Sequence, residues 1–211
     1  MESNFAFAFV MTLFIIQMLL SIHRIITICR DSRPRRKPKY KLIGISGKFG
    51  VGKDTAANWI VERWPEYQIV PFADALKRAV SIMTCTSYES QFTREGKAHV
   101  PPGYKETVGR YQQILGQLGR EHFREDVWVN IALKHPAEYK IIPDVRHPNE
   151  ADAITSAGGI VIRIVREGIV LNDGRDSTHI SETALDDYKF DNVIINDGSL
   201  DDFKKSLFAL L

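Results

Sequence analysis

The chain has 211 residues, which is enough for one α/β domain of ordinary size and leaves little for a second. A hydrophobic content of 44% and a charged content of 26% are typical of a globular protein and exclude a disordered one. The formal net charge is +2, but residues 30–41 hold seven basic residues and one acid, so the rest of the chain is mildly acidic. An acidic body is a poor match for a nucleic-acid backbone, and we expect no nucleic acid as a partner.

The two cysteines, Cys29 and Cys85, stand in neither a C-x-x-C nor a Cys/His spacing. This pattern argues against a disulfide scaffold and a structural zinc site, and it fits a reducing compartment. Acylation of Cys29 would add a lipid anchor, but we expect an unmodified thiol there.

Residues 5–22 are eighteen residues without a charge, and apolar residues resume over 25–29. As a helix this segment is at the lower edge of the roughly 20 residues that span a bilayer core. No basic region precedes it and no A-x-A site follows it, so a cleaved signal peptide is not indicated. The basic cluster follows it, so we expect residues 1–30 to be a membrane anchor that contacts the bilayer through residues 5–29 and leaves the next domain in the cytosol. Three alternatives stay open: an apolar helix lying on the domain, a rarely translated upstream extension, and a soluble cytoplasmic protein.

Residues 31–39 form a basic linker with two prolines and no apolar residue, so we expect the domain to cover residues 40–211. Beyond the linker, short apolar runs alternate with amphipathic stretches. We expect strands at Leu42–Ile45, Tyr67–Phe72, Lys140–Val145, Gly159–Val165 and Asn192–Asn196. We expect helices at Lys53–Trp64, Asp74–Met83, Val108–Arg124, Asp126–Leu133, Pro148–Ala157 and Leu200–Leu210. This alternation predicts a doubly wound α/β fold with a parallel sheet, whose ligands bind beyond the carboxyl ends of the strands.

Residues 47–53, Gly-Lys-Phe-Gly-Val-Gly-Lys, match the phosphate-loop pattern G-x-x-x-x-G-K. They follow an apolar run and open a helical pattern, which is the context in which this motif binds a nucleotide. Glycines let backbone N–H groups turn toward phosphate oxygens, and Lys53 supplies a charge that can follow the transferred phosphoryl group. The candidates for binding the expected cofactor, ATP, are Gly47, Lys48, Gly50, Gly52, Lys53, Asp54 and Thr55. A glycine-rich turn without a ligand is the alternative.

One position departs from the phosphate-loop pattern, which places a magnesium-binding Ser or Thr directly after the lysine. Here Asp54 stands in that place and Thr55 comes next. A carboxylate can ligate Mg²⁺ directly or through a water molecule, whereas the alternative is that Asp54 only favours the first turn of the helix. Asp144, at the end of an apolar run, stands where phosphate-loop proteins keep an acid near Mg²⁺. The magnesium candidates are therefore Asp54, Thr55 and Asp144.

Further segments carry a resemblance to a known family. They are GKDTAA at 52–57, PFADALKRA at 71–79, GRYQQILGQLGREHFREDVWVN at 109–130, DVRHPNEADAITSAGGIVIRIVR at 144–166, HISETAL at 179–185 and VIINDGSLDDF at 193–203. Together they resemble the deoxynucleoside monophosphate kinases of phages and large DNA viruses, a family of phosphate-loop kinases. The match is approximate at residues 111–115, and His147 stands where phenylalanine is usual. The resemblance implies that the chain transfers the γ-phosphate of ATP to a deoxynucleoside 5′-monophosphate, with Mg²⁺, giving ADP and the diphosphate.

Phosphoryl transfer needs cations positioned around the negative charge that develops in the transition state. The catalytic candidates are Lys53, Arg120, Asp144 and Arg146. Residues 166–179 are expected to form a mobile flap, from which Arg166 or Arg175 closes over the ATP phosphates. The candidates for binding the small-molecule nucleotide substrate are Lys77, Arg110, Gln113, Trp128 and Asn149. The alternatives are that the arginines are only solvated, that Trp128 fills the core and that Asn149 caps a helix.

Two other functions stay open at this point. A phosphate-loop kinase of another small substrate, similar to phosphomevalonate kinase or dephospho-coenzyme A kinase, would share the fold and the loop. A GTPase-like switch or a nucleotide-binding membrane scaffold without turnover is the alternative from a different class. The chain has neither the N-K-x-D nor the D-x-x-G signal that a GTPase switch carries, which disfavours the switch. The sequence leaves open which bases are accepted and whether the protein is a homodimer.

Overall fold

The computed structural model divides the chain into two units, residues 1–37 and residues 38–211. It describes residues 17–18, 37–167 and 183–211. All of the expected membrane anchor except residues 17–18 therefore lies outside the described residues, as do Cys29, most of the basic linker, Arg175 and most of the expected flap. No helix within the described residues is long and apolar enough to cross a membrane.

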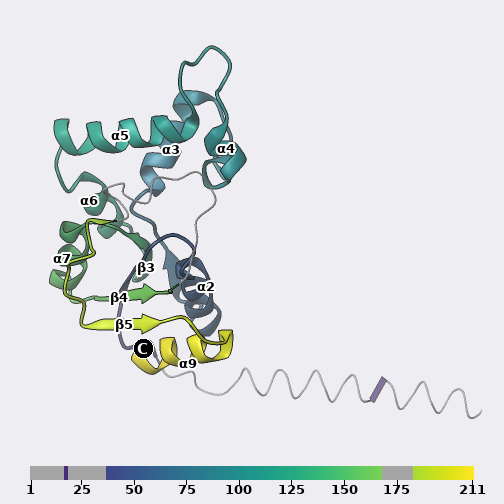
Figure 1. Ribbon diagram of the computed structural model, residues 1–211, viewed down its shortest axis with the longest axis vertical. Helices are drawn as coiled ribbons and strands as arrows, with labels where there is room; N and C mark the ends of the chain where they lie inside the picture. Colours follow the sequence, from purple (N-terminus) through teal and green to yellow (C-terminus); the bar gives the residue numbers. More distant parts are fainter. Residues whose placement is uncertain (1–16, 19–36, 168–182) are drawn as a thin grey trace, which may run out of the picture. The chain divides into compact units, whose positions relative to one another are not determined.

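The second unit is built on a five-stranded sheet in the order β2-β3-β1-β4-β5, in which all neighbouring strands pair in parallel (Figure 1). The strands are β1 (Leu42–Ser46), β2 (Tyr67–Ile69), β3 (Tyr139–Val145), β4 (Ile160–Val165) and β5 (Asn192–Ile195). The parallel α/β prediction is confirmed, and each expected strand is present. The expected end of β2 at Phe72 is wrong, because the Phe72 N–H group donates to the side-chain carboxylate of Asp144 and not to a backbone carbonyl of the neighbouring strand β3.

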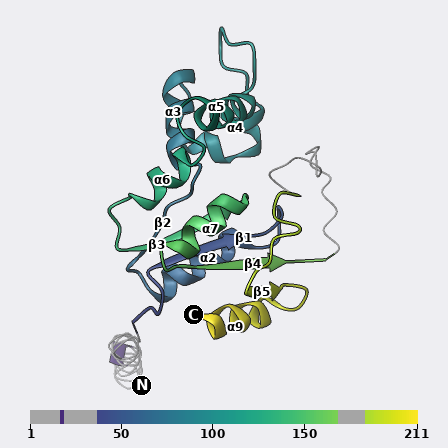
Figure 2. The same cartoon turned by 90° about the vertical axis from the view of Figure 1, so that its left-hand side faces the viewer.

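Helices cover both faces of the sheet. On one face lie α2 (Lys53–Arg63) and α9 (Leu200–Leu210), and on the other lie α6 (Val127–Leu133) and α7 (Pro148–Ser156). Figure 2 shows α7 and α9 on opposite sides of the strands. Side chains alternate between faces along a strand, so Ile43 and Ile45 pack with α2 and α9 while Leu42 packs with α6 and α7. The central strand β1 is buried on both faces, which is why its sequence is continuously apolar up to Ser46, whereas Val193 and Ile195 of the edge strand β5 are exposed.

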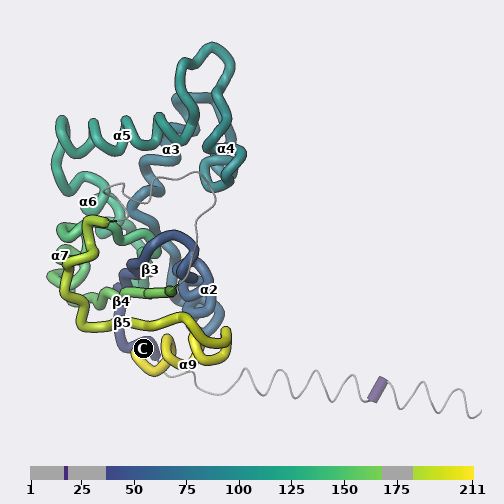
Figure 3. The backbone as a smooth tube through the Cα atoms, in the orientation of Figure 1, coloured from purple at the N-terminus to yellow at the C-terminus, as the bar shows by residue number. Residues whose placement is uncertain are grey.

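The chain between β2 and α6 forms a helical arm, defined here as residues 74–122. It contains α3 (Asp74–Thr84), the 3₁₀ turn η1 (Glu89–Phe92), α4 (Arg94–Ala98) and α5 (Val108–His122). Figure 3 traces the backbone of this arm and its return through α6 to β3. Gly119 of α5 allows the close packing of α6, since a Cβ atom there would lie 2.5 Å from the Trp128 ring.

Candidate active site

The strand order places the site at the carboxyl ends of β1 and β3. These strands are neighbours, yet the chain leaves β1 toward β2 at one edge of the sheet and leaves β3 toward β4 on the other side. Such a reversal opens a crevice between the two strand ends, which is where open α/β sheets bind ligands. The loop after β1 is the phosphate loop, and β3 ends with Asp144 and Val145.

The phosphate loop has the backbone shape that its sequence predicts. Gly50 and Gly52 have φ angles of 77° and 103°, and Gly52 is the N-cap of α2. These left-handed conformations suit glycine and turn successive N–H groups toward one side of the loop. The buried Asn196, directly after β5, supports the loop, because its Nδ2 donates to the Val51 carbonyl over 2.9 Å. A Cβ atom at Gly47 would lie 2.5 Å from the Ile164 carbonyl oxygen, so a larger residue does not fit there.

The side chain of Lys53 curls back over this loop. Its Nζ donates to the carbonyl oxygens of Gly47 and Lys48, each over 2.7 Å. Asp54 and Thr55 are exposed in the first turn of α2, where the helix dipole also favours anions. The loop backbone, Lys53 and the helix N-terminus therefore present positive charge and donors at one place.

Asp144 holds the start of the helical arm against the end of β3. Its Oδ1 accepts from the Phe72 N–H group over 2.8 Å, and its Oδ2 accepts from the Ala73 N–H group over 3.0 Å. Each carboxylate oxygen retains a second lone pair, so these bonds do not prevent it from facing a cation. No group of three His, Cys, Asp or Glu side chains in the described part of the chain is close enough to hold a metal ion.

Lys77 of α3 brings the arm into the same charged cluster. Burial lowers its pKa most, and further contributions come from Asp144 and Asp54, which raise it, and Arg146, which lowers it. The ammonium group therefore lies within electrostatic range of the phosphate-loop helix and of the residues after β3. Its Nζ also lies 3.9 Å from the centre of the Phe92 ring. Lys77, a candidate for substrate binding, thus lies near three predicted catalytic or magnesium-binding residues, Asp54, Asp144 and Arg146.

A buried carboxylate that was not predicted as a site residue, Glu150, connects two of the predicted arginines. Its Oε2 accepts from the backbone N–H groups of Arg146 and His147, over 2.7 and 3.1 Å. Its Oε1 accepts from Arg120 Nη2 of α5 over 3.3 Å. Burial is the main cause that raises the pKa of Glu150 to about 7. Glu150 is the N3 residue of a capping box at the start of α7. The sequence pattern for such a box is S/T-x-x-E, and it is not recognisable here because the N-cap residue is His147.

A second group missed by sequence reasoning lies beside the phosphate loop. Arg163 of β4 donates to the buried Ser46 hydroxyl over 3.0 Å and to Asp186 over 3.3 Å. The other oxygen of Asp186 accepts from Lys48 over 3.1 Å. The carboxylate thus joins a phosphate-loop lysine to a strand arginine. The sequence offered one signal for this group, an arginine inside an apolar strand, because a buried charge requires a partner of opposite charge.

The remaining candidates take no part in these contacts. Arg110 and Gln113 are exposed on α5 and bond to each other over 3.2 Å. The Trp128 indole donates to the Gly116 carbonyl over 3.0 Å, which favours packing between α6 and α5 as its role. Asn149 is partly buried in the first turn of α7, and Arg166 is exposed just after β4.

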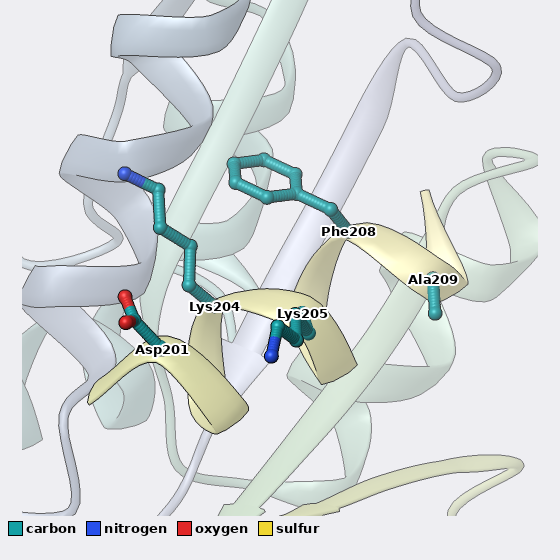
Figure 4. Close-up of a pocket in the computed structure, with 5 residues that line it drawn as sticks. All are labelled: Asp201, Lys204, Lys205, Phe208 and Ala209. Atoms are coloured by element: carbon teal, nitrogen blue, oxygen red, sulfur yellow. The ribbon is translucent and has the colours of Figure 1, made fainter. Parts of the chain in front are cut away.

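Figure 4 shows a surface hollow elsewhere on the unit. It is lined by Asp201, Lys204, Lys205, Phe208 and Ala209. All five residues come from α9, and none belongs to the phosphate loop or to the cluster around Asp144. The hollow has no place in the candidate active site.

The parallel sheet, the phosphate loop after its first strand and the helical arm define a phosphate-loop kinase fold. The family model for deoxynucleotide monophosphate kinase matches residues 104–207. A protein of Acanthamoeba polyphaga mimivirus, whose name proposes a deoxynucleotide monophosphate kinase, is 30% identical over 189 residues, which are 80% of this chain and 94% of that protein. The chain belongs to the deoxynucleotide monophosphate kinase family.

Two other viral proteins are also similar. The deoxynucleotide monophosphate kinase of Enterobacteria phage T4 is 45% identical over 104 residues, which cover 46% of this chain and 42% of the phage protein. An uncharacterized protein of Ictalurid herpesvirus 1 is 25% identical over 183 residues, covering 83% of this chain and 72% of that protein. The family resemblance expected from the sequence is confirmed.

Proposed function

We propose that this protein is a nucleotide kinase that transfers the γ-phosphoryl group of ATP to the phosphate of a deoxynucleoside monophosphate. The observation that carries the proposal is a phosphate loop with Lys53 lying on it, and Lys77 within electrostatic range of Arg146, Asp144 and Asp54, in a member of this family. Cations around the exchanged phosphates are what this reaction requires, because its transition state spreads negative charge over phosphoryl oxygens.

On the ATP side, the N–H groups of the phosphate loop and the N-terminus of α2 bind the phosphates. Lys53 leaves the carbonyl oxygens of Gly47 and Lys48, which it contacts over 2.7 Å, and turns to the phosphate oxygens. Arg166 and Arg175 are proposed to close over the same phosphates. Asp54, Thr55 and Asp144 offer the oxygen ligands that suit a hard cation, and we propose that they hold Mg²⁺, which neutralises phosphate charge when bound.

On the acceptor side, Lys77, Arg146 and Arg120 neutralise the phosphate that receives the phosphoryl group. The arginines are suited to this because a guanidinium fork can bind two phosphate oxygens at once. Arg110, Gln113, Trp128 and Asn149 are proposed to bind the base and sugar. Closing the arm over both nucleotides would exclude water, so that the phosphoryl group reaches the acceptor and not a water molecule.

The test is a coupled ADP-release assay with ATP, Mg²⁺ and the full chain. The acceptors are dAMP, dGMP, dCMP, dTMP and hydroxymethylated pyrimidine nucleotides. Phosphomevalonate and dephospho-coenzyme A serve as rival acceptors, and a reaction without acceptor gives the rate of ATP hydrolysis. We expect turnover with at least one deoxynucleotide. ATP binding without turnover of any of them would overturn the assignment.

The N-terminal segment is a separate proposal. Eighteen residues without a charge, followed by the basic residues of 30–41, support a membrane contact through residues 5–29. Fractionation of cells that express the full chain tests it, since release from membranes by salt alone would exclude a spanning helix. We also propose that the protein forms a homodimer, which light scattering of the detergent-solubilised chain would test through its molar mass.

A further inference from the structure

The two oxygens of the Glu150 carboxylate have different partners. Oε2 accepts both backbone N–H groups at the start of α7, from Arg146 and His147. Oε1 faces the guanidinium of Arg120, which comes from α5 of the helical arm. One side chain therefore links the loop after β3 to the arm.

Capping a helix does not explain why this residue carries a charge. The two N–H groups need a single acceptor oxygen, and a glutamine amide would supply it equally well. The side chain is only 4% exposed, and a buried carboxylate is costly unless a cation compensates it. Arg120 is a cation in contact with it, so the negative charge has a function at Oε1 that the cap does not need.

The contact between Glu150 and Arg120 lies close to the charged residues at the end of β3. Arg146 directly follows the end of β3, where the Asp144 carboxylate accepts from the Phe72 and Ala73 N–H groups at the start of the arm. Arg146 is also within electrostatic range of Lys77. The backbone N–H group of that same Arg146 is held by Glu150. A guanidinium fixed at Oε1 is thus kept next to the charged cluster, whereas an arginine side chain on a solvated helix has many rotamers.

We propose that Glu150 is a positioning residue, which holds the Arg120 guanidinium at the phosphate-exchange site through Oε1 while Oε2 fixes the backbone of Arg146. This inference rests on the proposed kinase function. It assigns the charge of Glu150 to the orientation of Arg120, so that the guanidinium reaches the transition state without first losing its rotamer freedom.

The Glu150→Gln variant separates the two oxygens. Its amide oxygen can keep the bonds at the helix start, while an NH₂ group would face the donors of Arg120. We expect kcat/KM for the deoxynucleotide to fall about 10- to 100-fold, as for the loss of a hydrogen bond to a charged group, with the KM for ATP within about twofold of its original value. Asp152→Asn is the matched control, because Asp152 is an exposed acid on the same helix.

A double-mutant cycle tests whether Glu150 acts through Arg120. In the Arg120→Met background, Glu150→Gln should cause no further loss of kcat/KM, since the partner is already absent. Fully additive losses would overturn the proposal, and so would a Glu150→Gln variant with unchanged activity.

A spectroscopic measurement keeps the positioning question apart from the kinase question. The guanidinium ¹⁵N signal of Arg120, assigned by its loss in Arg120→Met, should show restricted rotation in the original chain and free rotation in Glu150→Gln. Absence of turnover in the original chain would overturn the proposed function, and this signal would still decide whether Glu150 holds Arg120. An Arg120 signal that is identical in both proteins would overturn the positioning role.

Discussion

The phosphate loop and the helical arm supply the two sides of the site in different ways. The loop is fixed by its own backbone and by buried contacts, such as the bond from Asn196 to the Val51 carbonyl. On the arm, the candidates for substrate binding include exposed side chains such as Arg110 and Gln113, whose contact is with each other. In the proposed function, the nucleotide donor would therefore meet a cradle that is already formed, while the acceptor would meet side chains that must still be ordered.

This difference has an energetic consequence. Backbone N–H groups in a formed loop lose little entropy on binding, but each long side chain that becomes fixed costs about 0.5–1.5 kcal/mol. Changes on the loop should therefore alter the chemical step, whereas changes on the arm should alter how well the acceptor is held. Glu150 and Asp186 are informative because each connects one of these regions to the rest of the unit.

The largest effect is expected for Lys53→Met. The variant keeps a long side chain but removes the charge that faces the exchanged phosphate, so we expect kcat to fall by about 10³-fold or more. The free energy of unfolding should change little, because the bonds to the Gly47 and Lys48 carbonyl oxygens that are lost lie on a loop at the surface. Single-turnover kinetics and thermal unfolding measure the two quantities.

Lys205→Met is the control for that variant. Lys205 is exposed on α9 and lines the hollow of Figure 4, away from the phosphate loop. Activity close to that of the original chain is expected. Full activity in Lys53→Met would contradict the assigned role of the loop, and a large loss in Lys205→Met would mean that the α9 hollow takes part in the reaction.

The contrast between loop and arm also separates what the sequence could reveal from what it could not. The central strands were predictable because burial on both faces gives continuous apolar runs, and the long helices were predictable because amphipathic helices give a 3.6-residue period. The turn Glu89–Phe92 and the helix Arg94–Ala98 are too short to show a period, and both were missed. The end of β2 was misplaced because it depends on Asp144, which is distant in sequence.

The site residues follow the same division. The phosphate loop is local in sequence, so its glycines and Lys53 were predictable from one motif. Glu150 contacts Arg120, 30 positions away, and Asp186 contacts Lys48, 138 positions away. No local sequence pattern predicts contacts between residues so far apart. These contacts depend on the register of the sheet and on the packing of the arm, because both determine which distant charges lie close together.

An intermediate effect is expected from pH, acting through the link between arm and sheet. The charged groups that act on Glu150 are Arg120 of α5 and Asp144 of β3, and the backbone N–H groups of Arg146 and His147 donate to it. Burial is the main cause that raises the pKa of its carboxyl to about 7. Deprotonation creates the acceptor charge for Arg120, so kcat/KM should rise up to about tenfold as the pH increases through 7. In Glu150→Gln this rise should be absent.

The stability should change in the opposite direction. A carboxyl whose pKa is raised on folding stabilises the folded state below its ordinary pKa of 4.5, and this contribution is lost as the pH rises through 7. We expect the free energy of unfolding to decrease with pH in this range by at most about 3 kcal/mol relative to Glu150→Gln. Denaturant titrations at several pH values measure this difference. Equal pH dependence in the two proteins would show that Glu150 does not titrate there.

The smallest effect is expected at Asp186, which contacts the phosphate loop from outside. Its ion pair with Lys48 is half exposed, with side-chain exposures of 41% and 52%, so it contributes at most about 1 kcal/mol. Because phosphate oxygens must compete with this carboxylate for Lys48, Asp186→Asn should lower the KM for ATP by about two- to fivefold and leave kcat unchanged. Asp187→Asn removes the same charge one residue away and should leave the KM unchanged. The difference should shrink at high salt, which screens exposed pairs. A higher KM for ATP in Asp186→Asn would mean that the carboxylate holds Lys48 in its binding position, and that even the formed cradle depends on a side chain from another segment.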